Sequence, residues 1–209
     1  GDGCMQEGIT SEAASLAGHQ ELGNLIVIYD DNHISIEGNT EVAYSEDVVK
    51  RFDAYGWHTQ HVELGLDGDV DVKALASAMD NAMAEHGRPS LISLRTIIAW
   101  PAPDAQNTGK SHGAALGAEE IAKTKAIMGM DPDVNFAVAP EVLEHVRKVK
   151  ERGQAAHTEW DAAFDDWKAA HPERVPLLDR LLAKELPAEL ESALPVFDPS
   201  KDVATRKAS

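Results

Sequence analysis

Apolar and polar runs alternate along the first half of the chain in a way that predicts strands and helices in turn. Residues 24–32, NLIVIYDDN, form an apolar run rich in β-branched side chains and ending on polar ones, typical of a strand buried on both faces. The same pattern predicts strands over 57–64 and 90–98 and helices over 9–23, 45–55 and 70–86. This order indicates an α/β fold with a doubly wound, mostly parallel sheet.

The second half of the chain has a helical pattern. It predicts a short helix over 119–128, a long amphipathic helix from Pro140 to Trp167 with Gly153 as its weak point, and a helix over 177–186 that stops at Pro187. The prolines and then polar residues that follow are typical of a linker. We therefore expect an α/β domain over 1–116, a helical extension over 117–193 and a linker over 194–209.

Composition and charge narrow the classes of partner. The chain has 209 residues, enough for one substantial core, and a formal net charge of −17 from 36 acidic and 19 basic side chains. We expect no nucleic-acid partner, and an anionic small ligand only where backbone N–H groups, a metal or a histidine cancel the charge. The single cysteine, Cys4, predicts a reducing compartment, the cytoplasm by default. No apolar run reaches the ~18 residues of a membrane span.

Candidate chemistry begins at GDG, residues 1–3. Asp2 lies between two glycines just before a predicted helix, where the backbone can approach a phosphate or a divalent cation. Asn32 follows thirty positions later, at the end of the next predicted strand, so a β-α-β path brings both to one edge of the sheet. Taken alone, GDG is equally typical of a tight turn with a capping aspartate and of a phosphate- or cation-binding site. The position of Asn32 at the next strand end favours the binding site.

Carboxylate, amide and main-chain carbonyl oxygens are ligands that suit Mg²⁺ or Ca²⁺ better than zinc. We therefore expect Asp2, Asn32 and a carbonyl of the following turn to bind one divalent ion. GDG also occurs in phosphatases of the haloacid dehalogenase type. The CMQEG that follows here and the lack of an upstream DxDx[TV] motif argue against that class.

Other notable residues have an ordinary structural interpretation. His112, in GKSHGAALG, follows a predicted strand end, where an imidazole can donate to a phosphate or transfer a proton, or can be a loop histidine without a task. Glu7 lies in the predicted first helical turn, where capping explains an acid. Ile36 fits a core position, and Trp160, Phe164 and Trp167 fit helix packing.

Three stretches of the chain together resemble transketolases, and more narrowly bacterial ones. They are GDGCMQEGITSEAASLAGHQELGNLIVIYDDNHISIEG, RFDAYGWHTQ and TGKSHGAALG, and the resemblance extends to DPSKDVATRKAS, which is similar to the connection into a pyrimidine-binding domain. Two departures are Asp31, where the wider thiamine diphosphate pattern has asparagine, and Ala115, where many relatives have proline.

The resemblance implies a transferase that moves a two-carbon ketol group between ketose and aldose phosphates of the pentose phosphate pathway. It implies thiamine diphosphate with Mg²⁺, Ca²⁺ or Mn²⁺ as cofactors. The metal ligands would be Asp2, Asn32 and the main-chain oxygen of Ile34, and Gly3 and Asn32 would contact the diphosphate. Ile36 would pack near the thiazolium, and Glu7 would belong to an acidic network at the interface of a homodimer. His112 would contact the diphosphate and the sugar near the reacting carbon.

The resemblance also implies that residues 1–116 are the later part of a diphosphate-binding domain whose first strands precede this sequence. Other parts of the active site would come from an N-terminal segment and a pyrimidine domain, on the same or a separate chain, so this chain alone should not turn over. Two alternatives remain open: a non-catalytic fragment that needs a partner chain, and another thiamine diphosphate enzyme such as a dihydroxyacetone or deoxyxylulose phosphate synthase.

Overall fold

The structure is a computed structural model that describes residues 1–208. These residues divide into two compact units, one over residues 1–136 and one from residue 137 onward. The predicted boundaries at residues 116 and 193, between an α/β domain, a helical extension and a linker, stay a prediction.

A parallel sheet forms the centre of the first unit. Its strands β1 (Ile26–Asp31), β5 (Ser90–Arg95) and β4 (His58–Val62) lie in the order β1-β5-β4, and both outer strands run parallel to β5. Ser90 pairs with Ile26 on one side and with His58 on the other, so the strands begin at the same level, and Leu94 pairs with Asp30 and Val62 where they approach the opposite, carboxyl edge. The predicted parallel α/β sheet is confirmed.

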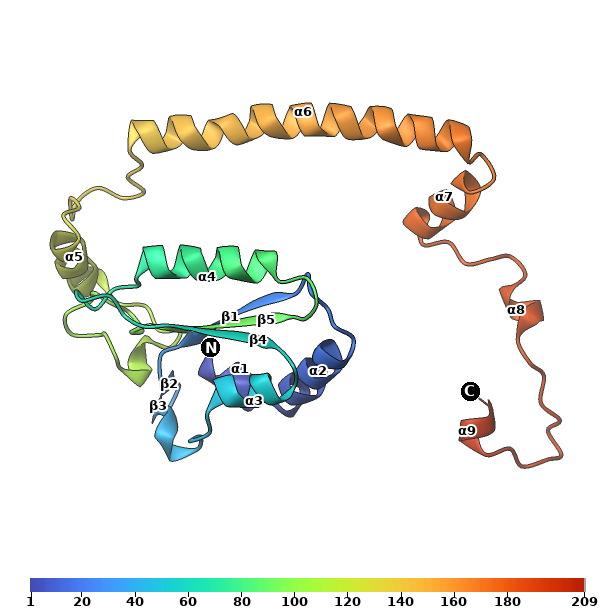
Figure 1. Ribbon diagram of the computed structural model, residues 1–209, viewed down its shortest axis with the longest axis horizontal. Helices are drawn as coiled ribbons and strands as arrows, with labels where there is room; N and C mark the ends of the chain where they lie inside the picture. The colour runs from blue at the N-terminus through green and yellow to red at the C-terminus, as the bar shows by residue number, and fades with distance from the viewer. Residues whose placement is uncertain (209) are drawn as a thin grey trace. The chain divides into compact units, whose positions relative to one another are not determined.

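Helices cover both faces of this sheet (Figure 1). On one face α2 (Gly8–His19) and α3 (Val48–Ala54) pack against Tyr29 and Leu91, and on the other α4 (Val72–Ala84) packs against Ile92. Leu91 and Ile92 are adjacent, fully buried and on opposite faces, because successive strand residues alternate. Burial of each stabilises the fold by about 1.5–3 kcal/mol. The doubly wound arrangement is confirmed.

The first predicted helix differs from the observed one. Helix α2 corresponds to it, and a further short helix, α1 (Asp2–Gln6), precedes α2 and is separated from it by an extended Glu7. Helix α2 ends at His19 because Glu21 adopts a left-handed φ of 54° and Leu22 N–H bonds back to the Ala17 carbonyl. Gly23 is therefore not the cap. A Cβ there would lie 2.0 Å from the His86 carbonyl oxygen, so close packing requires the glycine.

Capping aspartates set the start of the next two helices. Asp47 Oδ1 accepts from Lys50 N at 3.0 Å before α3, and Asp71 Oδ1 accepts from Ala74 N at 2.9 Å before α4. Both helices therefore begin later than the apolar pattern predicts. The final strand is shorter than predicted, since β5 stops at Arg95.

Short elements complete the first unit. A hairpin of β2 (Ile34–Ser35) and β3 (Gly38–Asn39) leads into the 3₁₀ turn η1 (Thr40–Val42), and neither was predicted. The predicted loop after residue 98 contains the 3₁₀ turn η2 (Gly109–Ser111) and ends at α5 (Ala118–Ile127), which follows a left-handed Gly117.

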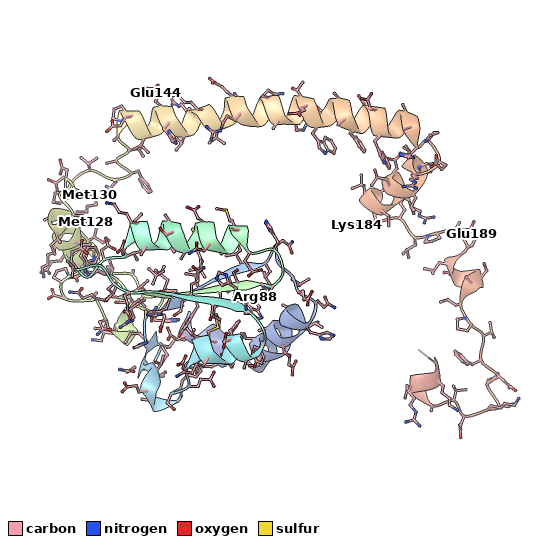
Figure 2. All side chains as sticks on the ribbon, in the orientation of Figure 1. Arg88, Met128, Met130, Glu144, Lys184 and Glu189 are labelled. Atoms are coloured by element: carbon pink, nitrogen blue, oxygen red, sulfur yellow. The ribbon has the colours of Figure 1, made fainter. Side chains whose placement is uncertain are left out.

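The second unit contains α6 (Pro140–Ala170), α7 (Val175–Ala183), α8 (Leu190–Ala193) and α9 (Thr205–Ala208). Helix α6 runs through Gly153 without a break. Its side chains project all around it, as Figure 2 shows from the labelled Glu144 onward. The Phe164 ring stacks on Trp160 and Trp167 at 4.8 and 5.7 Å, so the predicted aromatic stripe packs along its own helix. None of the helices described is both long and apolar enough to cross a bilayer.

Candidate functional site

Asp2 and Asn32 meet where α1 begins and β1 has ended. The Asn32 main-chain N–H donates to Asp2 Oδ2 at 3.2 Å, and the Tyr29 hydroxyl donates to Asp2 Oδ1 at 2.9 Å. Both side chains of the predicted pair are buried, with 2% of Asp2 and 7% of Asn32 exposed. The structure therefore brings together these two sequence-predicted residues and holds the carboxylate of Asp2 through both of its oxygens.

The Asn32 amide is fixed by its own neighbours. Asn32 Oδ1 accepts from the Ile34 main-chain N–H at 2.9 Å, and Nδ2 donates to Asp30 Oδ2 at 3.3 Å. His33 between them has a left-handed φ of 62°, and its carbonyl accepts from Thr40 N at 3.0 Å. These contacts turn the chain sharply into the β2–β3 hairpin, with Ile34 buried directly beside Asn32.

A hollow of about 490 Å³ opens beside this pair. Its wall includes five of the residues singled out from the sequence: Asp2, Gly3, Glu7, Asn32 and His112. Gly3 has no atom within 4 Å of where a Cβ would stand, so its backbone is open to an approaching group. The opening turn, the end of β1 and the loop after β5 thus contribute to one concave site, as the parallel topology predicts.

His112 is exposed at the end of η2, and the position of η2 is set by its close packing against the β2–β3 hairpin. A Cβ on Gly109 would lie 2.9 Å from both Gly38 N and the Ile36 carbonyl oxygen, so only glycine lets the loop sit against the hairpin. Ser111 Oγ donates to the Ala105 carbonyl at 2.6 Å. The hairpin after Asn32 therefore supports the loop that carries His112.

Glu120 anchors the same loop from α5. Its side chain is 8% exposed, and Oε1 accepts from the main-chain N–H groups of Asp104 and Ala105 at 2.7 and 2.9 Å. The carbonyl of Ala105 in turn holds Ser111, the neighbour of His112. A buried acid outside the site thus fixes the backbone on which the exposed histidine stands.

Ile34 and Ile36 are absent from the described residues that line the hollow. Ile36 is 68% exposed at the tip of the hairpin, so the expectation of a core position is wrong. Glu7 lines the hollow, but it is not in a helical turn. It joins α1 to α2 with an extended backbone and is the N-cap residue of α2. Its side chain makes no capping hydrogen bond, but an acid at this helix N-terminus is still favoured by the helix dipole.

Three comparisons with known proteins identify the family. Residues 1–187 match the family described as transketolase, thiamine diphosphate binding domain. The chain belongs to the transketolase family. The Mycobacterium leprae transketolase is 53% identical over 209 residues, which are all of this chain and 29% of that protein.

Solved transketolases share the fold as well as the sequence. A Pichia stipitis transketolase in complex with sedoheptulose 7-phosphate aligns with a TM-score of 0.83 at 42% identity, over 99% of this chain and 30% of that one. The Leishmania mexicana transketolase aligns with a TM-score of 0.82 at 36% identity, over 94% and 29%. This chain therefore spans about 30% of the length of the transketolases that it matches.

The surroundings of the Asp2 carboxylate fit a divalent cation. In the part of the chain that the structure describes, no basic side chain forms an ion pair with Asp2, whose carboxylate is buried against neutral donors only. A buried carboxylate is costly unless a cation balances it. Among residues 1–208 no three His, Cys, Asp or Glu side chains form a metal-ligand cluster, so a metal here would need amide and carbonyl oxygens beside Asp2.

Sequence reasoning missed a second hollow on the other side of Asp2, of about 570 Å³, and the network that lines it. Tyr29 also lies 3.1 Å from Asp31 Oδ1, which in turn lies 3.1 Å from His33 Nε2. Asp31 Oδ2 accepts from Ser93 at 3.4 Å.

One sequence signal for Tyr29 was available: it is the only aromatic residue in its apolar strand run, two positions before Asp31. Burial, and next the hydrogen bond to Asp2, raise the pKa of Tyr29, so its hydroxyl stays a donor.

Proposed function

We propose that this chain supplies the metal- and diphosphate-binding half of a transketolase active site. The reaction is the thiamine diphosphate-dependent transfer of a two-carbon ketol group from a ketose phosphate to an aldose phosphate. The observation that carries the proposal is the buried contact between Asp2 and Asn32, on the wall of a hollow that His112 also lines.

The metal ligands proposed are the Asp2 carboxylate, the Asn32 amide oxygen and the main-chain oxygen of Ile34. These hard oxygen donors favour Mg²⁺, with Ca²⁺ or Mn²⁺ as substitutes. The burial of Asp2 without a basic partner supports a cation at this position. Asn32 and Ile34 are already tied together by a hydrogen bond of 2.9 Å, so their positions need little rearrangement.

Gly3 and Asn32 are proposed to contact the diphosphate. The chain carries a net charge of −17, so an anionic group needs local compensation, which the metal and open backbone N–H groups supply. Thiamine diphosphate, when bound, supplies the carbanion chemistry that breaks and forms the carbon–carbon bond. The residues of this chain bind the cofactor, orient it and prevent it from binding in other orientations.

His112 is the proposed catalytic residue of this chain. It is exposed on the wall of the hollow, where its imidazole can donate to a diphosphate oxygen and hold a proton near the reacting carbon of the sugar. Ile36 is proposed to pack near the thiazolium, which its exposure at the hairpin tip permits. Glu7 is proposed to join an acidic network at a subunit interface, and its position on the wall of the hollow supports a role beyond the helix.

We further propose that the protein works on sugar phosphates of the pentose phosphate pathway, in the cytoplasm, as a homodimer with the active site at the interface. The complex of the Pichia stipitis transketolase with sedoheptulose 7-phosphate supports the substrate class. Because this chain spans about 30% of its relatives, segments equivalent to the rest of their length, on the same or a separate chain, are proposed to complete the site.

The deciding experiment measures thiamine diphosphate binding by calorimetry, with and without Mg²⁺, in the full natural polypeptide that carries this sequence. We expect metal-dependent binding that is lost in Asp2→Ala and retained in Asp80→Ala, an exposed aspartate on α4. Undiminished metal-dependent affinity in Asp2→Ala would contradict the proposal. Ketol transfer from xylulose 5-phosphate to a panel of aldose phosphates then tests the reaction, and acceptor preference separates transketolase from other ketol-transferring synthases.

A further inference from the structure

The hydroxyl of Tyr29 donates to the proposed metal ligand Asp2, although Tyr29 is not among the described residues that line the hollow with His112. Asp2 contributes to both hollows, whereas Asn32 lines only the one with His112 and Tyr29 lines only the other, among the described residues. Tyr29 is 3% exposed and its hydroxyl is 2.9 Å from Asp2 Oδ1. Asp2 therefore lines both hollows, and each of its two carboxylate oxygens has a donor of its own.

The hydroxyl has one proton to donate and two carboxylates within reach. Asp31 has another donor, because Ser93 Oγ–H donates to its Oδ2, and His33 Nε2 lies 3.1 Å from its Oδ1. Asp2 has only the Asn32 N–H besides Tyr29 among the described side-chain partners. The Tyr29 hydroxyl lies closer to Asp2 than to Asp31, and Asp2 has fewer other hydrogen-bond donors. Both facts favour donation of the Tyr29 proton to Asp2.

A donor on each oxygen restricts the carboxylate more than one donor does. The Cβ–Cγ torsion of an aspartate has a broad energy well, so a carboxylate held through a single oxygen still turns about that bond. With Oδ1 held by Tyr29 and Oδ2 by Asn32, the plane of the Asp2 carboxylate is fixed before any cation arrives. Partners that orient a metal-ligating carboxylate in this way change metal affinity by about 10- to 100-fold.

We propose that Tyr29 is a positioning residue for the metal site: its hydroxyl orients the Asp2 carboxylate for the divalent cation and touches neither cofactor nor substrate. This inference rests on the proposed function, since it assigns Tyr29 to the metal site proposed there. The inference goes beyond the proposed function because it assigns control of metal affinity to a buried residue of β1 that is not itself a proposed ligand.

The test is Mn²⁺ binding measured by electron paramagnetic resonance, at saturating thiamine diphosphate, in the full natural polypeptide. Tyr29→Phe keeps the ring and removes the hydroxyl, and we expect a Kd for Mn²⁺ about 10-fold higher or more. The matched control is Tyr44→Phe. Tyr44 lines the same hollow, but its hydroxyl lies 3.3 Å from Arg51 Nη2, and no hydrogen bond joins it to Asp2 among the described residues. We expect its Kd to stay within twofold of the unmutated protein.

A purely structural role gives a different result. In that case Tyr29→Phe lowers the thermal midpoint of the metal-free protein and leaves the Kd for Mn²⁺ within twofold, which overturns the inference. Equal weakening in Tyr29→Phe and Tyr44→Phe overturns it as well. The proposed function fails separately, if the unmutated protein shows no metal-dependent cofactor binding or if Asp2→Ala binds as well as the unmutated protein.

A second measurement does not depend on the folding of a phenylalanine variant. 3-Fluorotyrosine introduced at position 29 or at position 44 keeps the ring and the hydroxyl and reports the environment of each by ¹⁹F NMR. Addition of Mg²⁺ with thiamine diphosphate should shift the resonance at position 29 and leave that at position 44 unchanged. No shift at position 29, or equal shifts at both positions, would count against a role for Tyr29.

Discussion

The main-chain N–H of Asn32 donates a hydrogen bond of 3.2 Å to Oδ2 of Asp2, across thirty positions of sequence. Helix α2 and strand β1 fill the interval, so the contact depends on the packing of this helix against the sheet.

Asn32→Ala should weaken metal-dependent cofactor binding by about 10- to 100-fold, because it removes a proposed ligand oxygen and frees the Ile34 N–H from its acceptor. The loss of that buried hydrogen bond should also cost about 1–3 kcal/mol of stability. The measurements are calorimetry and chemical denaturation. Asn39→Ala is the control, since Asn39 Oδ1 accepts from Glu41 N two positions later at 3.0 Å, but on the surface. Equal cofactor affinity in the two variants would exclude Asn32 from the site.

His112→Ala should lower kcat for ketol transfer by about 100-fold or more and change the Kd for thiamine diphosphate much less. The proposed role of this exposed histidine on the wall of the hollow is proton transfer and contact with the sugar, and its removal loses little buried surface. Steady-state kinetics of the natural polypeptide provide the measurement. His145→Ala, on the exposed surface of α6, serves as the control. An unchanged kcat in His112→Ala would remove the residue from the mechanism.

Gly109→Ala should displace η2 from the hairpin. The added Cβ would lie 2.9 Å from backbone atoms of Ile36 and Gly38, which cannot rotate away as a side chain would. We expect a loss of about 1–3 kcal/mol of stability and a lower kcat, because His112 moves with η2. At Gly87 the corresponding contact is with the Glu85 side chain at 3.4 Å, so Gly87→Ala is the control. Equal effects on kcat would show that η2 does not place His112.

Glu120→Ala should loosen the loop that leads to His112. The substitution leaves the main-chain N–H groups of Asp104 and Ala105 without their buried acceptor, at a cost of about 1–3 kcal/mol. Limited proteolysis should cut between residues 104 and 117 faster than in the unmutated protein. Glu119→Ala, at the exposed neighbouring position, should leave the cleavage rate unchanged. Identical cleavage in both variants would refute the anchoring role.

Asp47 should make the stability of α3 depend on pH. A side-chain hydrogen bond with Lys50, and next the bond from the Lys50 N–H, lower the pKa of Asp47 below its ordinary 3.8. A lowered folded-state pKa contributes stability that is present above pH 3.8 and lost as the pH falls through the lower folded-state value.

Asp47→Ala should therefore destabilise α3 by about 1 kcal/mol near neutral pH, and the difference should shrink below pH ~4. Amide hydrogen exchange of α3, corrected for the intrinsic rate at each pH, provides the measurement. Asp53→Ala, an exposed aspartate near the end of the same helix, is the control. A difference that is constant across pH would show that the charge of Asp47 does not matter.

The α/β class, the parallel strands and the residues worth testing follow from the amino-acid sequence alone. Apolar runs such as 24–32 carry that information locally, because burial on both faces demands an uninterrupted apolar strand. The parallel topology then brings Asp2 and Asn32 to one edge of the sheet. Helix limits were less predictable, because caps at Asp47 and Asp71 and a left-handed Glu21 set them.

The contacts that hold the candidate site, in contrast, form only when the chain is folded. No sequence period indicates that the Tyr29 hydroxyl reaches Asp2, that Gly109 fits against the hairpin or that Glu120 holds the loop before His112. Each of these contacts joins segments that are far apart along the chain. Their partners are chosen by distance and by the need of each buried polar group for a hydrogen bond, and neither is encoded at a fixed spacing along the chain.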